Sequence, residues 1–524
     1  MNYLEGKIKI PMKKRILFTI LLGGLFILAC SDDETPNNPD SEVIESINVQ
    51  LNPSGYAPLT AIIELQTNQG VGIELTVVGK NGDASSITHR FDERGSSFDL
   101  EVLGLYPGFT NTVELKLLDA GNNILETREV IVQTDPVIAD MPQITIDVAS
   151  NSSGPEFNFV NYFGFSQNFR PQRPFIFDQF GDIRWYLNFV SHPSLSNLFY
   201  DNGMTRLANG NLLTGDGFTG NIHEVDMMGN LINTWSLQGN GFHHHVIEKP
   251  DGNLLVTIND ASKSTVEDVV IEIDRNSGEF ANTWDLNNLL DNSRRAWPTD
   301  LADLNIDWFH ANAIEYSSQD DEIIVSGRTQ GIVKLNAQNQ VSYILAPHRE
   351  WNTSGDGVEL TQFLLTPLDV NDQEITDAAI LDGTANHPDF EWSWYQHSPI
   401  LMPNGNLMVF DNGDNRNYAN AGPYSRAVEY EIDEVNKTIK QVWSYGKDRG
   451  EDTYARIVSK VSYVAENNSV LFTPGSAVNN GTAAGKIVEL DYSTKQVIFE
   501  ATVTPPNTVF NISFHNVLRM PLYD

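Results

Sequence analysis

Cysteine is almost absent from this chain of 524 residues, because Cys30 is the only one. A single thiol excludes an internal disulfide, so the fold depends on packing and hydrogen bonds. Basic residues are scarce as well: 33 lysines and arginines stand against 69 acidic residues, which leaves a net charge of -36. Nucleic acid is therefore disfavoured as a partner, since phosphate binding requires a basic face.

Helical periodicity is also missing after roughly the first thirty residues. Aromatic residues make up 10% of the chain, and its 38 glycines include many in Asn-Gly and Asp-Gly turns. This composition is typical of an all-β protein. The length exceeds that of one ordinary domain, so we expect a large domain and a smaller one.

Apolar runs of membrane-spanning length are lacking too, although one shorter run stands near the amino terminus. It extends from Ile16 to Ala29 and follows Lys13-Lys-Arg15. This length fits the core of a signal peptide and is short for a membrane span. The run ends in Ile27-Leu-Ala-Cys30, which resembles a bacterial lipobox. We therefore expect a lipoprotein signal peptide over 1–30, lipidation of Cys30, and a protein anchored by lipid in the bacterial cell envelope, at the outer membrane on its periplasmic or surface side.

A polar tether is expected over 31–42, and short alternating apolar and polar segments follow over 43–137. Turn residues separate these segments at intervals of roughly ten, which is the spacing of an immunoglobulin-like β-sandwich. The segments lie at 47–51, 61–65, 72–77, 111–117 and 129–132. No residue of this part stands out chemically. We interpret it as a support for the larger domain, joined to it by a linker over 136–142.

An internal repeat fills the rest of the chain. One copy reads His244-His-Val-Ile-Glu-Lys-Pro-Asp-Gly-Asn and another His397-Ser-Pro-Ile-Leu-Met-Pro-Asn-Gly-Asn, each a short apolar strand that enters a tight turn. Six copies can be aligned in this way. Their first position is occupied by Asn202, His244, His310, His397, Ser459 and His515. If each copy is one blade of a propeller, these six side chains converge on one axis.

The repeat predicts where the blades lie. Five whole units fall near 203–238, 244–287, 310–346, 397–446 and 459–503. The sixth is expected to be split, with outer strands at 174–177 and 183–187 and its inner strand at 514–519, because such closure removes open sheet edges. The predicted fold class is all-β, a six-bladed β-propeller over 143–524 preceded by a small immunoglobulin-like β-sandwich. Long connections at 288–307 and 347–392 are expected to form walls or lids.

Several separated motifs in this part of the chain resemble the bacterial arylsulfate sulfotransferases that need no adenosine phosphosulfate. They are Trp308-Phe-His310-Ala-Asn312, Ser326-Gly-Arg328, Gln396-His397, Phe410-Asp-Asn-Gly-Asp-Asn415, Tyr424-Ser-Arg-Ala-Val-Glu-Tyr430 and Gln441-Val-Trp-Ser-Tyr-Gly446. The resemblance spans most of residues 145–524, and a small sandwich in front also suits that family.

The resemblance implies an active site on the propeller axis and a covalent sulfohistidine intermediate. By motif, His397 would be the nucleophile, with His244, His310 and Arg328 around the sulfuryl group. A neutral imidazole attacks sulfur well and splits one difficult transfer into two easier steps. Arg328 offers a planar fork of donors for the equatorial oxygens. The implied substrates are a phenolic sulfate donor and a phenol acceptor, with no cofactor and no metal.

Other positions carry weaker assignments. Asn312 matches a polar site position of the family, and Ser459 is placed as a substrate-binding residue by repeat register alone. His515 shares the register but matches no family motif, which favours a shaping contact over catalysis. His244 is flanked by two further histidines, and the register favours it over both neighbours. The run 411–414 resembles a fragment of a calcium loop, but it lacks the full ligand spacing, so we interpret it as a turn.

Two other functions are compatible with histidines on a propeller axis. The first is a histidine-ligated metal centre of the oxygenase type, which requires carboxylates behind the histidines and has no need of Arg328. The second is a surface propeller without catalytic activity that binds aryl or sulfated ligands. The sequence does not identify the natural donor and acceptor, competition by water, or the oligomeric state.

Overall fold

The computed structural model describes residues 42–523, except for 152–155, 166–172, 199–202, 296, 298, 420–421, 477, 479–483 and 507–510. Within it, Val43–Asp524 forms one compact unit. The predicted signal peptide with Cys30, and nearly all of the predicted tether, lie outside the described residues. In the part of the chain that the structure describes, no helix is both long enough and apolar enough to cross a membrane.

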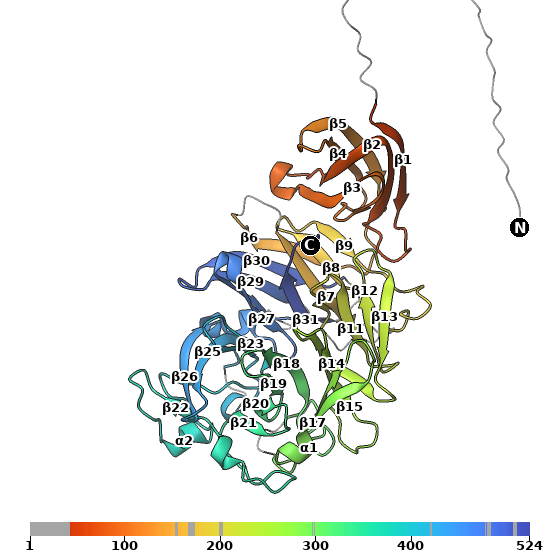
Figure 1. Cartoon of the computed structure of the whole chain (residues 1–524). Coiled ribbons are helices and arrows are strands. Elements are labelled where there is room, and N and C mark those ends of the chain that lie inside the picture. Colours follow the sequence, from red (N-terminus) through yellow and green to blue (C-terminus); the bar gives the residue numbers. More distant parts are fainter. Residues whose placement is uncertain are drawn as a thin grey trace, which may run out of the picture. The chain divides into compact units, whose positions relative to one another are not determined.

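A five-stranded sheet network forms the amino-terminal domain (Figure 1). Its strands are β1 (Ile44–Leu51), β2 (Ala61–Val77), β3 (Ile87–Val102), β4 (Thr110–Leu118) and β5 (Ile124–Gln133), with the 3-10 turn η1 (Gly82–Ser85) after β2. The first part of β2 pairs with β1 and its last part with β4, while β3 pairs along both parts. Alternate side chains of β2, such as Ile63 and Leu75, are buried in the core.

One prediction for this domain was wrong. The segments 61–65 and 72–77 were expected to be separate strands, but both belong to β2. The pairing of β2 with β3 shifts register between Gln66 and Val71, so the turn-like residues between them form an irregularity within a continuous strand. Strand β3 was not predicted.

Six further sheets follow in the described residues, and their innermost strands surround a common axis (Figure 1). The first holds β10 (Thr205–Arg206), β11 (Leu212–Asp216), β12 (Asn221–Val225) and β13 (Leu231–Ser236). The second holds β14 (Gly241–Glu248), β15 (Leu254–Asn259), β16 (Val269–Ile273) and β17 (Phe280–Asp285). The third holds β18 (Ala311–Ser317), β19 (Glu322–Gly327), β20 (Gly331–Asn336) and β21 (Val341–Leu345).

The last three sheets each contain a strand from a distant part of the sequence. In the fourth and fifth sheets this strand is an additional fifth strand at the edge. The fourth holds β23 (His397–Leu401), β24 (Leu407–Asp411), β25 (Arg426–Asp433) and β26 (Thr438–Tyr445), with β22 (Thr366–Leu368) parallel to β26. The fifth holds β27 (Lys460–Val464), β28 (Ser469–Thr473), β29 (Gly485–Asp491) and β30 (Val497–Thr504), with β6 (Gln143–Val148) at its edge. The sixth holds β31 (Asn511–Arg519), β7 (Phe157–Phe165), β8 (Phe175–Asp178) and β9 (Ile183–Tyr186).

These sheets form a closed ring. The innermost strands β14, β18, β23, β27 and β31 contact one another in that order, and β14 also contacts β11 of the first sheet. Between the sixth and first sheets, the Asn516 side chain donates a hydrogen bond of 2.7 Å to the Met204 carbonyl. The Arg206 guanidinium donates to the carbonyl of Pro521 across the same junction. The predicted split sheet, closed by the carboxy-terminal strand, is thereby confirmed.

The repeat residues explain how each blade holds its own turn. Asn253 of the second-blade turn donates from its side chain to Glu272 on the third strand of that blade at 2.8 Å. Asn406 makes the same contact with Glu429 in the fourth blade, at 2.7 Å. In both blades, the asparagine that follows the turn glycine binds the glutamate on the third strand of the same blade.

Tryptophans on outer strands join neighbouring blades. The indole N–H of Trp235 on β13 donates to the carbonyl of Arg275 at 2.8 Å, and that of Trp284 on β17 donates to the carbonyl of Asn336 at 2.8 Å. Trp443 on β26 donates in the same way to Tyr492, at 2.9 Å. Buried indole N–H groups require a partner, and here the partner is the next blade.

The long connections carry the short helices. They are α1 (Leu286–Leu289), α2 (Ala378–Leu381) and the 3-10 turns η2 (Thr361–Phe363), η3 (Arg416–Tyr418) and η4 (Lys447–Thr453), whereas η5 (Ala465–Asn467) lies in the short turn between β27 and β28. The connection before β23 is packed closely against the propeller: Trp392 and Trp394 are 1% and 0% exposed. The end of this connection therefore packs beside the residues that begin β23.

Candidate active site

Irregular backbone at the start of the innermost strands turns side chains toward the axis. The pairing registers of β14, β18, β23 and β31 each shift near their predicted histidine. His244 and His310 have left-handed backbone angles, with φ of 58° and 57°. Such conformations are costly for residues other than glycine, and bulges of this kind re-aim side chains at functional sites.

Five of the predicted positions line one cavity of about 100 Å³ on the axis. They are His244, Asn312, His397, Ser459 and His515. Each belongs to, or directly precedes, the innermost strand of a different blade. Four of these five occupy the repeat position itself. In the third blade Asn312 lines the cavity in place of His310, and neither His310 nor Arg328 is among the lining residues. The remaining repeat position, Asn202, lies outside the described residues.

His397 is held in one tautomer. Its Nδ1 lies 2.8 Å from the side-chain oxygen of Asn412 and 3.1 Å from the carbonyl oxygen of Tyr395. The Asn412 amide nitrogen donates to the carbonyls of Ala455 and Val458, at 2.8 and 3.0 Å, so the Asn412 oxygen must face the imidazole. Because both neighbours of Nδ1 are acceptors, the proton resides on Nδ1 and the lone pair on Nε2.

The electrostatics of the site keep His397 neutral. Burial lowers its pKa to about 3, the hydrogen bond to Asn412 opposes that effect, and interactions with His515, His310 and Arg328 lower the pKa further. At neutral pH this imidazole is therefore an unprotonated nitrogen nucleophile.

His310 has the opposite environment. Its Nδ1 faces the carboxylate of Glu267, to which it is closely paired, and lies 3.1 Å from Asp307. Burial and the nearby Arg328 disfavour the charged ring, but Glu267 and Asp307 together outweigh them and raise the pKa of His310 to about 9. The site thus pairs a neutral imidazole, His397, with a protonated one.

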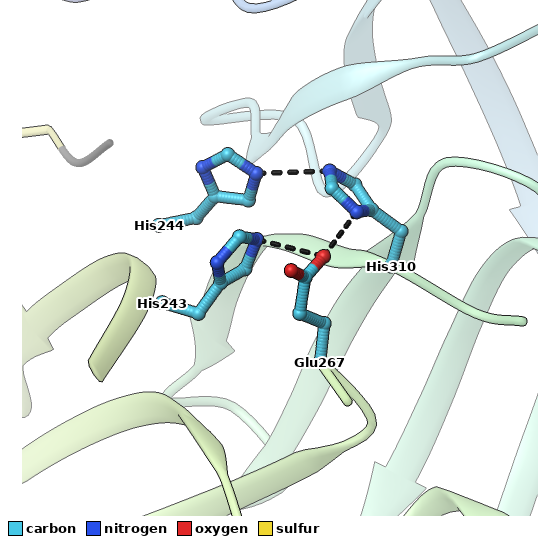
Figure 2. Close-up of side chains that lie close together, drawn as sticks. All are labelled: His243, His244, Glu267 and His310. Atoms are coloured by element: carbon cyan, nitrogen blue, oxygen red, sulfur yellow. Dashed lines mark hydrogen bonds and ion pairs between the residues drawn. The ribbon is translucent and has the colours of Figure 1, made fainter. Parts of the chain in front are cut away.

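His310 connects the carboxylates to the cavity. Its Nε2 lies 2.9 Å from Nε2 of His244 and 3.0 Å from Nη1 of Arg328 (Figure 2 shows the three histidines and Glu267). Since arginine only donates and His310 carries protons on both nitrogens, the Nε2 proton of His310 is donated to His244. Nη2 of Arg328 donates to Asp307 at 2.9 Å. Arg328 is 7% exposed, and its hydrogen bond to Asp307 holds it beside His310.

The neighbours of His244 have other contacts. Nε2 of His243 lies 2.9 Å from Glu267. His245 accepts a hydrogen bond of 3.0 Å from the Ile314 amide at Nδ1, and burial lowers its pKa to about 3. Of the three consecutive histidines, His244 alone both lines the cavity and contacts His310.

Asn312 and Ser459 use their polar atoms to hold the scaffold. The Asn312 side-chain nitrogen donates to the carbonyl of Gln396 at 2.9 Å, which fixes the residue just before His397. The Ser459 hydroxyl accepts from the amide of Gly475 at 2.9 Å. His515 lies beside His244, with ring centroids 5.0 Å apart.

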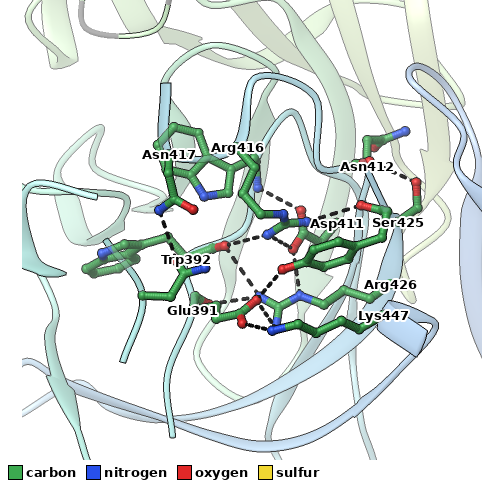
Figure 3. Close-up of polar contacts among 12 residues, drawn as sticks. Glu391, Trp392, Asp411, Asn412, Arg416, Asn417, Ser425, Arg426 and Lys447 are labelled. Carbon is green, nitrogen blue, oxygen red and sulfur yellow. Dashed lines mark hydrogen bonds and ion pairs between the residues drawn. The ribbon is translucent and has the colours of Figure 1, made fainter. Parts of the chain in front are cut away.

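A buried polar network surrounds Asp411 and Asn412 (Figure 3), and Asn412 is the side chain that contacts His397. Asp411 accepts from Arg426 at 2.7 Å and from Arg416 at 2.9 Å, and it also accepts the amide of Trp394. The Ser425 hydroxyl donates to the carbonyl of Asn412 at 2.8 Å. The run 411–414, which the sequence indicated to be only a turn, therefore locks β24 to the segment that carries His397.

Three functional neighbours were missed by sequence reasoning. Asn412 belongs to the family-like motif that begins at Phe410. Phe410 pairs with His397 in the sheet, so the position of Asn412 two residues later could have indicated that it lies near His397. Asp307 stands directly before the motif that begins at Trp308, where an acidic residue three positions ahead of His310 was a weak signal. Glu267 lies before β16 and had no signal at all, since only the fold brings it to His310.

The fold and the site together define an all-β propeller with an imidazole-lined cavity on its axis. A model of the arylsulfotransferase family matches residues 144–511, and a model of the arylsulfotransferase Ig-like domain matches residues 48–135. The chain belongs to the arylsulfotransferase family, and its enzyme class is that of the aryl-sulfate sulfotransferases, which act on small phenolic molecules.

Individual relatives agree. The chain is 28% identical over 554 residues to the arylsulfate sulfotransferase AssT of Escherichia coli O6:H1, covering 87% of this chain and 90% of the relative. It is likewise 28% identical to the enzyme of that name from Lelliottia amnigena, over 553 residues with the same coverage. Among solved structures, virginiamycin B lyase from Staphylococcus aureus aligns with a TM-score of 0.33 and 10% identity, over 69% of this chain and 99% of that one.

Proposed function

We propose that this protein moves a sulfuryl group from a phenolic sulfate ester to a phenol through a sulfohistidine at His397. The observation that carries the proposal is the hydrogen bond between Nδ1 of His397 and Asn412, which leaves Nε2 as the unprotonated nitrogen. His397 also lines the axial cavity, so the reacting nitrogen belongs to a ring that a substrate can reach.

In the first half-reaction, the lone pair of Nε2 attacks sulfur, the bond from sulfur to the aryl oxygen breaks, and a phenolate leaves with the electron pair. The transition state is loose and in line, by analogy with phosphoryl transfer, and spreads charge over the equatorial oxygens. Arg328 is permanently charged and lies beside the cavity, where it stabilises that charge. The phenolate takes a proton from the His310–His244 pair, whose nitrogens are 2.9 Å apart.

In the second half-reaction, a phenol occupies the place of the first product. Its oxygen attacks sulfur, the nitrogen–sulfur bond breaks, and His397 regains its lone pair. The phenolic proton returns to the His310–His244 pair, so protons balance over one cycle. Each step uses only side chains of the described site.

The proposed function is tested by release of nitrophenol from 4-nitrophenyl sulfate. Protein lacking residues 1–30 and treated with a chelator is assayed with and without phenol, beside His397→Ala and the matched control His223→Ala, a buried histidine whose Nδ1 contacts Thr234. We expect phenol-dependent release that disappears in His397→Ala and persists in His223→Ala. Mass spectrometry of the phenol-free mixture should show one added sulfuryl group on the peptide that contains His397.

Two results would contradict this function. Release that depends on added metal favours a metal centre. Binding of the aryl sulfate without release favours a propeller that only binds its ligand. The metal alternative requires carboxylates behind the histidines, and Glu267 and Asp307 do lie behind His310. It has no need of Arg328, yet Arg328 contacts both His310 and Asp307.

We also propose that Cys30 is lipidated and anchors the protein in the bacterial cell envelope, as the apolar run and the lipobox-like Ile27-Leu-Ala-Cys30 indicate. Metabolic labelling with an alkyne fatty acid, followed by detergent phase partitioning, tests this anchor. Cys30→Ala should abolish the label, whereas a labelled Cys30→Ala protein would contradict the proposal.

A further inference from the structure

One cluster beside the proposed active site combines His310 with His243, a residue that the proposed sulfuryl transfer does not use. His243, Glu267 and His310 meet in a buried corner between β14, β16 and β18, with His244 above them (Figure 2). Nε2 of His243 lies 2.9 Å from Oε2 of Glu267, and Nδ1 of His310 contacts the same oxygen. His243 has no part in holding His397 or Arg328.

We propose that His243, Glu267 and His310 form a binding site for a divalent transition-metal ion of the Zn²⁺ type, and that occupancy of this site inhibits the transferase. Two imidazoles and a carboxylate are preferred ligands of such ions. The donor atoms of His243, His244, Glu267 and His310 all lie within 4.8 Å of one another. Ligands of a tetrahedral zinc ion stand about 3.3 Å apart, so small side-chain rotations suffice.

The donor atoms of this cluster are poorly satisfied. Among the described residues, Nε2 of His243 and Oε2 of Glu267 are buried atoms that make no hydrogen bond of regular geometry, although they form an ion pair with each other. His243 is only 8% exposed, so water provides little compensation. Buried polar atoms of this kind are costly unless a partner is supplied, and a metal ion supplies one to both atoms at once.

Glu267 is held in place for such a role. Its amide donates to the side chain of Asn259 at 2.8 Å, and its carbonyl accepts from the amide of Ala311 at 2.7 Å. Its backbone is left-handed, with φ of 61°, a conformation that these two contacts maintain. The carboxylate therefore does not have to be ordered when an ion binds.

The contacts of His310 set the consequence. Nδ1 of His310 faces Glu267 and Asp307, while its Nε2 lies 2.9 Å from Nε2 of His244, which lines the cavity. A metal ligand must present a lone pair, so an ion bound at Nδ1 occupies the lone pair of that nitrogen. The ring can then no longer exchange a proton through the His310–His244 pair that the proposed function uses. Occupancy should therefore slow the first half-reaction, whereas the metal-free enzyme remains active.

Binding is tested first, with cobalt as a spectroscopic probe. Chelator-treated protein lacking residues 1–30 is titrated with Co²⁺ and followed by visible absorption, beside His243→Ala, the isosteric Glu267→Gln and the control His223→Ala. We expect one equivalent to bind with visible ligand-field bands in the wild type and in His223→Ala, and no bands in the other two. Absence of bands in the wild type, or unchanged bands in His243→Ala, would overturn the site. Thermal unfolding of each variant establishes that loss of binding is not loss of fold.

Inhibition is tested separately and rests on the proposed function. A saturating concentration of Zn²⁺ should suppress release of nitrophenol by the wild type. His243→Ala should release nitrophenol without Zn²⁺ and should continue to do so when Zn²⁺ is added. Full activity of the zinc-loaded wild type would overturn the inhibitory role. If the metal-free enzyme releases no nitrophenol at all, the proposed function fails, but the cobalt spectrum still decides the metal site, so the two failures are distinguishable.

Discussion

Asn412 accepts the Nδ1–H of His397 at 2.8 Å, and its own amide nitrogen donates to two backbone carbonyls. The orientation of the amide is therefore fixed by the protein, and the orientation of the amide fixes the tautomer of the imidazole. This relationship makes Asn412 a positioning residue, which acts on the substrate only through His397.

Asn412→Ala should lower kcat by about 10- to 100-fold, because the imidazole loses the acceptor that keeps its proton on Nδ1. KM for the sulfate donor should change little, since Asn412 does not line the cavity. Steady-state kinetics with 4-nitrophenyl sulfate measure both parameters. The control is Asn417→Ala, whose side chain contacts Gly383 in the neighbouring loop. A rise in KM with kcat unchanged would argue against a positioning role.

Activity of the chelator-treated enzyme should form a broad plateau between about pH 3, where His397 becomes protonated, and about pH 9, where His310 loses its proton. Glu267→Gln removes the carboxylate that raises the pKa of His310, so its alkaline limb should move toward neutral pH. Profiles of kcat/KM from pH 4 to 10 test this shift. Glu279→Gln, at an exposed position of the same blade, should leave the limb in place.

The same two histidines make opposite contributions to stability. The pKa of His310 rises from 6.5 to about 9 on folding, so its contribution is complete below pH 6.5 and is lost as the pH rises through 9. The pKa of His397 falls from 6.5 to about 3, so folding is favoured above pH 6.5 and this advantage is lost as the pH falls toward 3. Denaturant unfolding of His397→Ala at pH 4 should show a smaller loss of stability on acidification than the wild type.

Arg328→Ala should lower kcat/KM by about 10²- to 10³-fold, because one fixed donor group for the equatorial oxygens is lost. Arg328→Lys should recover only part of the rate, since an ammonium lacks the planar fork that pairs with Asp307. Arg349→Ala, at an arginine whose side chain is 41% exposed, provides the control. Full recovery by lysine would show that only the charge of Arg328 matters.

Asp411→Ala should destabilise the fold by about 3–5 kcal/mol, because it leaves two buried guanidinium groups, Arg416 and Arg426, without their shared carboxylate. Asp448→Asn, at an exposed position, should change stability by no more than about 0.5 kcal/mol. Denaturant titration followed by tryptophan fluorescence measures both. Equal stabilities would mean that the network behind His397 is not structural.

The fold was largely predictable because the repeat is dense. The apolar strand, the Gly-Asn turn, the acidic residue and the returning tryptophan recur in register, and each has a local physical reason, such as the contact between Asn253 and Glu272. Prediction failed in β2, where Asn68-Gln-Gly70 has the composition of a turn but lies within a strand. Local composition cannot distinguish an irregular strand from a turn when the pairing partners are unknown.

The site was predictable at the positions that the repeat aligns and unpredictable elsewhere. His244, His397 and His515 share a register, and a shared register in a ring places side chains on the axis. Glu267 reaches His310 from the adjacent blade, across a sequence separation that no local pattern spans. The opposite charge states of His397 and His310 follow from these distant contacts, so they too required the fold.

The last strand, β31, pairs with β7 near the start of the propeller and carries His515 into the axial cavity. The axial cavity is therefore complete only when β31 has paired with β7, because that pairing brings His515 to the axis. A substitution that weakens the pairing of β7 with β31 should disturb the cavity even though the substituted residue lies outside it.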